Sequence, residues 1–216
     1  MRLLDLFCGA GGAAMGYYRA GFEVVGVDIE DRPTYPFEFW RMNALHLDYE
    51  KLALFDVIHA SPPCQQYSKS TALARRRGKT YPDLYQPVKA MLVAAGKPYV
   101  IENVMGSPVR GIGLCGTMFG LGVFRHRVFE SNIPLKLPEN RCLCSQRRIG
   151  KGYVTVAGDS CTKLEALGAL GIHWRMSKDE VTEAIPPAFT EFIGRQLHEK
   201  LLLINDENRV LIEVRQ

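Results

Sequence analysis

The sequence predicts an α/β fold with a doubly wound, mostly parallel sheet and a small irregular lobe inserted near its C-terminal end. Along residues 1–128, short apolar runs typical of buried strands alternate with segments of helical spacing. Parallel strands covered by helices on both faces produce this alternation. From about residue 129 to residue 174 the pattern gives way to Pro, Gly, Cys and Arg, and a helical pattern returns afterwards. We therefore expect a main domain (1–128), a small lobe (129–174) and a C-terminal segment (175–216) that returns to the main domain.

The main domain contains four clear strand patterns. "RLLDLF" (2–7) is a short apolar run that breaks into the glycine loop "CGAGGAAMG" and then into the helical segment "YYRAGFE". "EVVGVDI" (23–29) follows as a second buried strand. "FDVIHA" (55–60) and "PYVIENV" (98–104) are the next two, and "LYQPVKAMLVAAG" between them has helical spacing. Such runs, bounded by glycine and proline, are typical of strands buried on both faces.

The C-terminal segment predicts one helix followed by a strand. In "PPAFTEFIGRQLHEKLLL" an apolar residue recurs every four positions, which places these residues on one helical face. A turn at "NDEN" (205–208) and a strand at "RVLIEV" (209–214) are expected to close the chain. The residues of the apolar face are Phe189, Ile193, Leu197 and Leu201.

Composition excludes several classes of protein. The 216 residues are 47% hydrophobic and 23% charged, which is ordinary for one globular domain with an appendage. No run of eighteen apolar residues is present, and the first apolar run is too short for a signal peptide. We expect the six cysteines to be free thiols in a reducing cytoplasm. The net charge of +4 is concentrated at 74–79 and 141–151, which fits a polyanionic partner.

The glycine loop has the spacing of a nucleotide-binding turn. Gly9, Gly11 and Ala14 form G-x-G-x-x-A between a strand and a helix, and Asp28 ends the next strand. Glycines let a ligand approach the backbone, and an acidic side chain there can accept both ribose hydroxyls. NAD and S-adenosylmethionine both carry such a ribose, and a tight turn without a ligand has the same glycines. NAD, however, gives no role to the Pro-Pro-Cys loop described next.

"SPPCQ" (61–65) holds Cys64 on a stiff loop directly after a predicted strand. Proline fixes φ and pushes the preceding residue toward extended geometry, so Ser61-Pro62-Pro63 cannot be ordinary helix. A buried structural cysteine after a strand end is the simpler alternative. Ligands of doubly wound sheets bind beyond the carboxyl ends of the strands. The glycine loop, Asp28, "SPPCQ" and "ENV" (102–104) all fall there, which favours a functional Cys64.

Taken together and in order, these stretches resemble the cytosine-C5 DNA methyltransferase family. "DLFCGAGG" looks like its first motif, "SPPCQ" its catalytic fourth and "ENV" its sixth. "FRHRVFES" is similar to its eighth and "EAIPPAFTEFIG" to its tenth. The resemblance spans nearly the whole chain outside 129–174. It implies the Rossmann-like sheet of class I S-adenosylmethionine-dependent methyltransferases, with 1–128 as catalytic domain and 129–174 as a small target-recognition lobe.

The resemblance implies a covalent mechanism. Cys64 would add to C6 of cytosine, and Glu102 would hydrogen-bond N3 with a carboxyl of raised pKa. Arg125 and Arg127 would hold the base carbonyl and a flanking phosphate. The target base must leave the duplex to be reached. A strand-end glutamate paired to arginine, and solvated strand arginines, are the ordinary alternatives for these residues.

The expected cofactor is S-adenosylmethionine, with S-adenosylhomocysteine as its product. Three departures from the family pattern concern its site. Val123 stands where the eighth motif usually has Gln, and Thr182-Glu183 stands where the tenth usually has Gly-Asn. Asn43 replaces the usual acceptor for the adenine amino group. The residues expected to bind the cofactor are Phe7, Gly9, Gly11, Gly12, Asp28, Ile29, Asn43, Pro62, Glu183 and Ala184.

The run "STALARRRGK" (70–79) after the nucleophile predicts a mobile loop that closes on DNA. It has no apolar face and carries four basic side chains suited to phosphate. An exposed charge run that contacts nothing is the alternative. The residues expected to bind DNA are Gln65, Ser68, Arg75, Arg76, Arg77 and Lys79.

The cysteines of the lobe raise the question of a metal. Cys142 and Cys144, with Cys161 and His173 downstream, offer four zinc ligands to a lobe too small for its own core. Cys-x-Cys is a poorer spacing than Cys-x-x-Cys, and free reduced thiols account for the same residues. We therefore predict no metal.

These observations predict an enzyme that methylates C5 of cytosine in DNA. An RNA substrate is the first alternative, although the Cys-Phe-Thr tripeptide of the family's tRNA branch is not found here. Transfer of another one-carbon group to DNA cytosine is the second, and a DNA-binding remnant without turnover is the third. We expect a monomer with DNA as its partner, in the cytoplasm of a bacterial or phage-infected cell, and the small lobe favours a phage enzyme.

Overall fold

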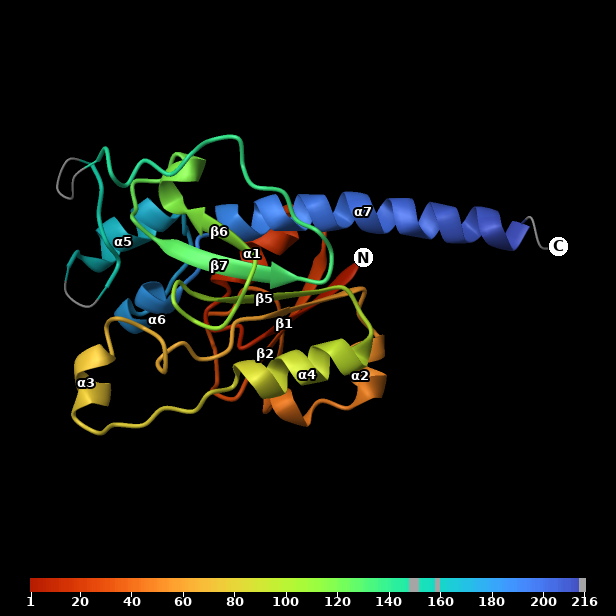
Figure 1. Cartoon of the computed structure of the whole chain (residues 1–216), viewed down its shortest axis with the longest axis horizontal. Helices are drawn as coiled ribbons and strands as arrows, with labels where there is room; N and C mark the ends of the chain where they lie inside the picture. The colour runs from red at the N-terminus through yellow and green to blue at the C-terminus, as the bar shows by residue number, and fades with distance from the viewer. Residues whose placement is uncertain (148–151, 158–159, 214–216) are drawn as a thin grey trace.

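The computed structural model describes residues 1–147, 152–157 and 160–213 and shows a seven-stranded sheet with helices on both faces (Figure 1). The strand order is β3-β2-β1-β4-β5-β7-β6. The strands are β1 (Arg2–Leu6), β2 (Glu23–Asp28), β3 (Glu38–Arg41), β4 (Val57–Ala60), β5 (Tyr99–Val104), β6 (Ile112–Cys115) and β7 (His126–Ser131).

Most of the sheet is parallel, as the sequence predicts. Strands β1 to β5 pair in parallel, β7 runs antiparallel to β5, and β6 runs antiparallel to β7. The predicted strands correspond to β1, β2, β4 and β5. The sequence pattern did not single out β3, the edge strand, whose four residues are exposed or half-buried and so carry no buried apolar run. The doubly wound α/β fold is therefore confirmed.

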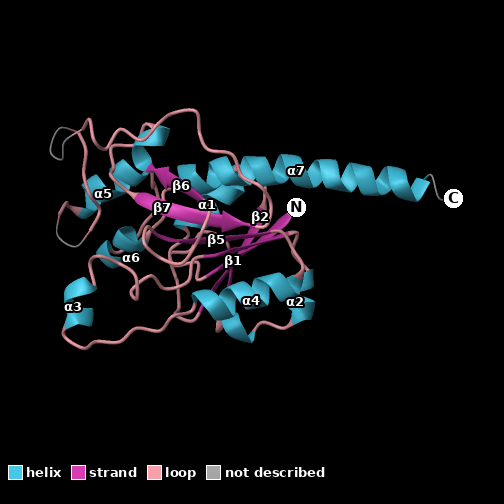
Figure 2. Ribbon diagram, viewed as in Figure 1, coloured by secondary structure: helices cyan, strands magenta, loops and turns pink. Residues whose placement is uncertain are grey.

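The helices form a layer on each face of the sheet (Figure 2). Helices α1 and α7 pack against each other on one face, and α2 and α4 lie on the other. Short 3₁₀ turns η1 (Ala44–His46) and η2 (Gly116–Phe119) join strands to neighbouring segments. The helices are α1 (Gly12–Arg19), α2 (Tyr49–Ala53), α3 (Ala72–Arg76), α4 (Tyr85–Ala95), α5 (Lys163–Leu170), α6 (Lys178–Glu183) and α7 (Pro187–Glu213).

Alternation along the central strand builds a core on both faces. Leu3 of β1 belongs to the cluster that contains Phe189 and Ile193 of α7. Leu4, the next residue, belongs to the cluster that contains Val88 of α4. Successive side chains of a strand point to opposite faces, so a run of apolar residues is buried on both sides. The polar residues are therefore found in the loops at the ends of the strands.

The C-terminal segment differs from the prediction. Helix α7 is continuous from Pro187 to Glu213 and extends beyond the body of the molecule (Figure 1). The predicted turn at 205–208 and strand at 209–214 are wrong over the described residues, and residue 214 lies outside them. No glycine or proline interrupts 205–213, and a nucleated helix adds residues without a new nucleation step. Among the described helices, none has both the length and the apolar character that crossing a membrane requires.

The described part of the lobe contains one helix and a small apolar cluster. Helix α5 begins with a capping box between Thr162 and Glu165. Its Leu170 packs with Val156 of the lobe and with Ala10 of the glycine loop. The Trp174 indole N–H also donates to the Ala10 carbonyl at 2.9 Å. Strand β7 spans residues 126–131 and so runs across the predicted 128/129 boundary, and the division into domains stays a prediction.

Candidate active site

The predicted site residues meet at the carboxyl edge of the parallel strands. The glycine loop follows β1, Asp28 ends β2, "SPPC" follows β4, and Glu102 lies near the end of β5. Because β1, β2, β4 and β5 are parallel neighbours, these ends lie at one edge of the sheet. The topology therefore brings together segments that are far apart in the sequence.

The glycine loop combines an open side with a packed side. Gly9 has a φ of 51°, and a Cβ built there would meet nothing within 4 Å. Its backbone is therefore open to a ligand. A Cβ at Gly12 would lie 2.5 Å from the Ile185 carbonyl oxygen, so any side chain there would displace the C-terminal segment. Gly9 thus leaves room for a ligand, while Gly12 lets residues 184–185 pack on the start of α1.

Asp28 is already surrounded by hydrogen-bond donors. Its Oδ2 accepts from the Gly9 N–H at 3.0 Å, and its Oδ1 accepts from the Glu30 N–H at 3.0 Å. The Arg32 guanidinium lies 3.3 Å from Oδ2 and 3.4 Å from Oδ1. A ligand hydroxyl would therefore replace Arg32 rather than the backbone donors. The adjacent Ile29 side chain is 65% exposed, which leaves a large apolar surface beside the carboxylate.

Three further residues predicted to bind the cofactor have contacts of their own. Asn43 Oδ1 caps η1 by accepting from the Leu45 N–H at 3.0 Å. Burial raises the pKa of Glu183 at the end of α6, and Arg32 opposes that rise. Ala184 lies against Gly12. These contacts bring residues 183–184 to the glycine loop, as the resemblance implies.

Cys64 is held by a buried amide on β5. The Asn103 side-chain NH₂ donates to the Pro62 carbonyl at 3.0 Å, and its Oδ1 accepts from the Val104 N–H at 2.9 Å. The Cys64 carbonyl accepts from the backbone N–H groups of Tyr67 at 2.9 Å and Ser68 at 2.8 Å. The backbone before and after Cys64 is therefore held by hydrogen bonds.

The two cysteines nearest the site differ in their surroundings. Burial raises the pKa of the half-buried Cys64 thiol, and the positive charge of Arg127 opposes the rise. Burial also raises the pKa of Cys8, and there the negative charges of Asp5 and Asp28 raise it further. A thiolate is the reactive form of cysteine. The arrangement therefore favours Cys64 over Cys8 as a nucleophile.

Glu102 is a buried carboxyl with one charged partner. Its Oε1 lies 2.8 Å from Nε of Arg127, which the neighbouring strand β7 supplies. Burial raises the pKa of Glu102, while Arg127 and a hydrogen bond from Ser61 act in the opposite direction. The ion pair named in the sequence analysis as the ordinary alternative is thus present. It also places Arg127 beside the carboxyl that the resemblance assigns to the base.

Arg125 joins the sheet to the lobe. Its side chain is buried, with Nη1 donating to the Val156 carbonyl at 3.0 Å and Nη2 to the Thr182 carbonyl at 2.8 Å. Burial, together with the charge of Arg127, lowers the pKa of Arg125 to about 9. Neither arginine is a solvated strand charge. In this structure Arg125 connects β7 to the lobe and to the segment that carries Glu183.

A buried polar chain behind Glu102 was missed by the sequence reasoning. The Tyr17 hydroxyl lies 2.9 Å from Nδ1 of His59, and His59 Nε2 lies 2.8 Å from the Ser61 hydroxyl. Ser61 also lies near Glu102, whose pKa it lowers. Burial lowers the pKa of His59 to about 3, so the imidazole is neutral at ordinary pH. A histidine inside the apolar strand "FDVIHA" was the available signal.

The basic run after Cys64 divides into two groups. Arg75 on α3 turns inward, and its Nη1 donates to the Gln65 carbonyl at 2.7 Å and to the Ser68 carbonyl at 2.9 Å. Arg76 and Arg77 are exposed, as is Lys79. Arg75 therefore stabilises the loop that carries Cys64, and the following basic side chains are the ones available to a phosphate. The mobility of this loop stays a prediction.

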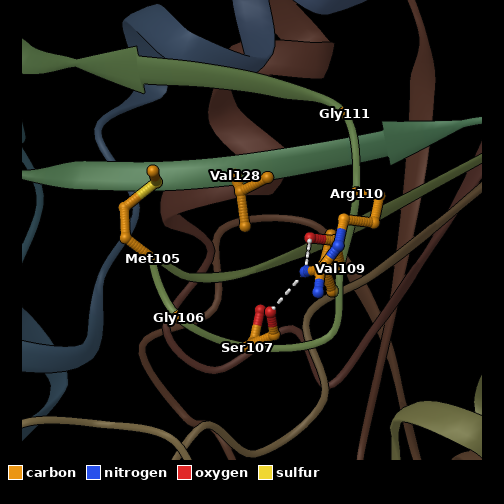
Figure 3. A pocket seen from close by; sticks show the side chains of 7 residues that line it. All are labelled: Met105, Gly106, Ser107, Val109, Arg110, Gly111 and Val128. Carbon is orange, nitrogen blue, oxygen red and sulfur yellow. Dashed lines mark hydrogen bonds between the residues drawn. The ribbon is translucent and has the colours of Figure 1, made fainter.

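Two surface hollows lie near the site without containing its predicted catalytic residues. One of about 310 Å³ follows β5, where Arg110 Nη1 donates to the Ser107 carbonyl at 2.9 Å (Figure 3). A cleft of about 710 Å³ lies between the loop after Arg32 and the start of α6. The first is lined by Met105, Gly106, Ser107, Val109, Arg110, Gly111 and Val128. The second is lined by Pro33, Thr34, Lys163, Arg175, Met176, Ser177 and Glu180.

Comparison with known families matches the first half of the chain. Residues 1–106 match the family described as C-5 cytosine-specific DNA methylase. This stretch includes the glycine loop, Asp28, Cys64 and Glu102. The segments that carry Arg125, Arg127 and the residues packed on Gly12 lie beyond it.

Curated relatives and solved structures agree with this match. The Type II methyltransferase M.HgiGI of Herpetosiphon aurantiacus is 32% identical over 117 residues, which is 48% of this chain and 90% of the relative. The Type II methyltransferase M.FnuDI of Fusobacterium nucleatum is 30% identical over 116 residues, or 49% of this chain but only 33% of the relative. The structure of S. pombe Dnmt2 methyltransferase covers 93% of this chain and 99% of its own, with a TM-score of 0.60 at 13% identity. At this low identity, the similarity to the Dnmt2 structure shows a shared fold and nothing more.

Proposed function

Since the chain belongs to the cytosine-C5 DNA methyltransferase family, we propose that it transfers a methyl group from S-adenosylmethionine to C5 of cytosine in DNA. One observation carries the proposal. Glu102 and Arg127 form an ion pair at 2.8 Å, and Cys64 and the open backbone of Gly9 follow neighbouring strands at the same edge of the sheet. A nucleophile, a buried acid and a cation beside a nucleotide-binding loop are the groups that this reaction needs.

The role of Cys64 is to make C5 of cytosine nucleophilic. Its thiolate forms a bond to C6, and the electron pair of the C5–C6 double bond becomes available at C5 and N3. This covalent step splits one difficult substitution into two easier ones. Arg127 favours the thiolate through its charge, and the Pro62 carbonyl held by Asn103 fixes the loop. The later loss of the C5 proton and of the thiolate restores the aromatic ring and frees Cys64.

The role of Glu102 is to stabilise the charge that develops at N3. A protonated carboxyl can donate a hydrogen bond there, and burial favours the protonated form. Arg127 lies against the same carboxyl and can hold the base carbonyl. The Arg127 guanidinium at 2.8 Å also gives the carboxyl a fixed orientation.

The residues around Asp28 fit S-adenosylmethionine. When bound, this group supplies an electrophilic methyl on a sulfonium. The open side of Gly9 leaves space for it, Asp28 would accept its ribose hydroxyls, and the exposed Ile29 would cover its adenine. Asn43 would contact the adenine edge through its amide, and Glu183 would lie near the ribose. The other residues proposed for this site are Phe7, Gly11, Gly12, Pro62 and Ala184.

DNA is the proposed partner, with the target base turned out of the helix. The reacting carbon of cytosine is not accessible to Cys64 while the base is stacked in a duplex. The exposed Arg76, Arg77 and Lys79 lie in the segment directly after the nucleophile, where phosphates of a bound strand would pass. Gln65 and Ser68 flank the same turn. Arg125 supports the strand that carries Arg127 rather than contacting the base.

The deciding experiment is transfer of labelled methyl to defined nucleic acids. The purified protein is incubated with labelled S-adenosylmethionine and with DNA or RNA. The nucleic acid is then digested to nucleosides, and their masses are measured by mass spectrometry. We expect labelled 5-methyl-2′-deoxycytidine from the DNA and no labelled nucleoside from the RNA. Label in RNA only would replace the DNA assignment with the RNA alternative. A different mass added to cytosine would identify another one-carbon group. A complete lack of transfer would contradict the proposed methyltransferase activity.

Replacing Asp28 should weaken cofactor binding. Hydrogen bonds to a charged group contribute about 1.5–3 kcal/mol each, so loss of the ribose contacts in Asp28→Ala predicts a fall in affinity of at least about tenfold. Calorimetry with S-adenosylhomocysteine measures it. Glu30→Ala is the matched control, because its carboxylate also pairs with Arg32 but is largely exposed. Equal affinity in Asp28→Ala and wild type would contradict the assignment.

Removing Arg76 and Arg77 should reduce the salt dependence of DNA binding. Each neutralised phosphate contributes a slope of about 0.9 log units of affinity per log unit of salt, so the double alanine variant should have a shallower slope. Lys51→Ala with Arg195→Ala is a control that removes the same charge from α2 and α7. A slope that changes equally in both variants would mean that 76–77 make no specific phosphate contact. Arg75→Ala should leave the slope intact, because Arg75 is bound within its own loop.

A further inference from the structure

Four potential metal ligands converge at the β6–β7 edge of the sheet, and one of them stands between Arg125 and Arg127 in the sequence. Cys115 ends β6, His126 begins β7, and Cys142 and Cys144 lie in the loop that follows β7. Their sulfur and nitrogen ligand atoms all lie within 4.8 Å of one another. The sequence reasoning had grouped Cys142 and Cys144 with Cys161 and His173. The structure brings in Cys115 and His126 instead.

Strand pairing and two loop contacts create this convergence. Cys115 and His126 are register partners in the antiparallel pair β6–β7, so their side chains lie side by side. The loop after β7 then returns to the same place, where the Leu143 N–H donates to Thr117 Oγ1 at 3.0 Å. The Asn140 side-chain NH₂ donates to the Met118 carbonyl at 3.2 Å. Cys142 and Cys144 are thereby fixed over the end of the hairpin.

The distances are close to those of a tetrahedral zinc site. Zinc with bonds of about 2.3 Å to sulfur and about 2.0–2.1 Å to nitrogen places its sulfur and nitrogen ligands about 3.5 Å apart and two sulfurs about 3.8 Å apart. His126 Nε2 lies 3.5 Å from the Cys142 sulfur and 3.6 Å from the Cys144 sulfur. The Cys115 and Cys144 sulfurs are 3.3 Å apart. That separation is also far longer than a disulfide bond of about 2.05 Å.

We propose that Cys115, His126, Cys142 and Cys144 bind one zinc ion in a closed structural site. Three thiolates and one imidazole complete a tetrahedron and leave no position for a substrate, which is the arrangement of structural zinc. This site replaces the expectation of no metal, which rested on the Cys-x-Cys spacing considered without the hairpin. It does not depend on the proposed methyl transfer.

The segment that the zinc would hold has polar contacts but few apolar anchors. In residues 131–147 every side chain is exposed or half-buried. Ile133 and Leu135 contact the core, but Leu137 is largely exposed and no apolar anchor follows it in this segment. A short segment without a core needs a crosslink or a metal to hold one conformation. The zinc would join this segment to β7, the strand that carries Arg127 and begins directly after Arg125.

Elemental analysis of untagged protein, purified under reducing conditions, tests the site. We expect one zinc per chain in the wild type and a fall to background in His126→Ala, whose exposed imidazole contributes little to folding otherwise. His126→Cys keeps four ligands and should retain the metal. Cys161→Ser is the matched control, because this half-buried cysteine packs on the apolar cluster of the lobe and lies near the Thr155 carbonyl, apart from the four proposed ligands, and its loss should leave zinc unchanged.

Two further measurements keep the proposal falsifiable if a variant folds poorly. X-ray absorption at the zinc edge of the wild type should show three sulfurs and one nitrogen, and a chelator should lower the melting temperature of wild type but not of His126→Ala. A wild type without zinc after growth in zinc-supplemented medium, and without uptake after reduction, would overturn the site. So would full zinc content in His126→Ala, loss of zinc in Cys161→Ser, or a Cys115–Cys144 disulfide in the reduced protein.

Discussion

Cys64→Ala should abolish methyl transfer to DNA. Removal of a covalent nucleophile typically lowers turnover by up to about 10⁶-fold, because no other group can take over the bond-forming step. The neighbouring side chains in "SPPCQ" are proline, serine and glutamine, none of which forms a comparable nucleophile at neutral pH. Binding of S-adenosylhomocysteine should be retained, since Cys64 lies outside the glycine loop. A labelled-methyl assay and calorimetry on the same preparation separate the two effects.

A fluorine at C5 of the target cytosine gives a direct test of the covalent bond. Release of the thiolate requires loss of a proton from C5, and fluorine cannot leave as a cation. Duplex DNA with 5-fluorocytosine at the target should therefore trap the enzyme after methyl transfer. The adduct should depend on added S-adenosylmethionine and map to the peptide that contains Cys64.

Cys8→Ala is the matched control for this experiment. Cys8 is the other thiol close to the glycine loop, but it is buried and the carboxylates of Asp5 and Asp28 raise its pKa. The Cys8→Ala protein should still form the adduct, and Cys64→Ala should form none. An adduct on Cys8, or turnover retained in Cys64→Ala, would mean that the covalent mechanism is wrong.

Glu102→Gln should lower kcat/KM by about 10²–10⁴-fold, the range typical of a lost general acid. The amide occupies the same volume and keeps a polar contact with Arg127 and Ser61, but it cannot transfer a proton to N3. The pH dependence should change as well. Because burial raises the pKa of Glu102, its protonated form extends to higher pH, and wild-type activity should fall as pH rises through that pKa. The glutamine variant should lack this alkaline decline.

Glu130→Gln provides a control of the same kind. Glu130 is also a buried strand glutamate with one cationic partner, Lys89 at 2.6 Å, but it lies on β7 away from Cys64. Its replacement should leave the pH profile and kcat/KM close to wild type. If Glu102→Gln kept both the rate and the alkaline decline, Glu102 would be a structural ion-pair partner of Arg127 and not the acid.

The sequence by itself determined four of the five parallel strands and indicated where along the chain the proposed functional groups lie. Continuous apolar runs at β1, β2, β4 and β5 identify strands buried on both faces, because exposed strands alternate. The glycine loop and the Pro-Pro-Cys loop are local signals, since a glycine or a proline restricts the backbone at its own position. Edge strand β3 and the continuation of α7 escaped prediction, because neither has a strong local pattern.

Only the tertiary structure decided which residues act together. Arg75 looks like its neighbours in the sequence, yet it turns inward because two carbonyls of its own loop face it. His59 looks like a core residue, yet its two ring nitrogens contact the Tyr17 and Ser61 hydroxyls. The cysteines of the lobe looked poorly spaced for a metal, and the register of the β6–β7 hairpin supplied Cys115 and His126 as neighbours. The physical reason is common to all three cases: a side chain's partners are set by strand register and loop return, which depend on residues far away in the chain.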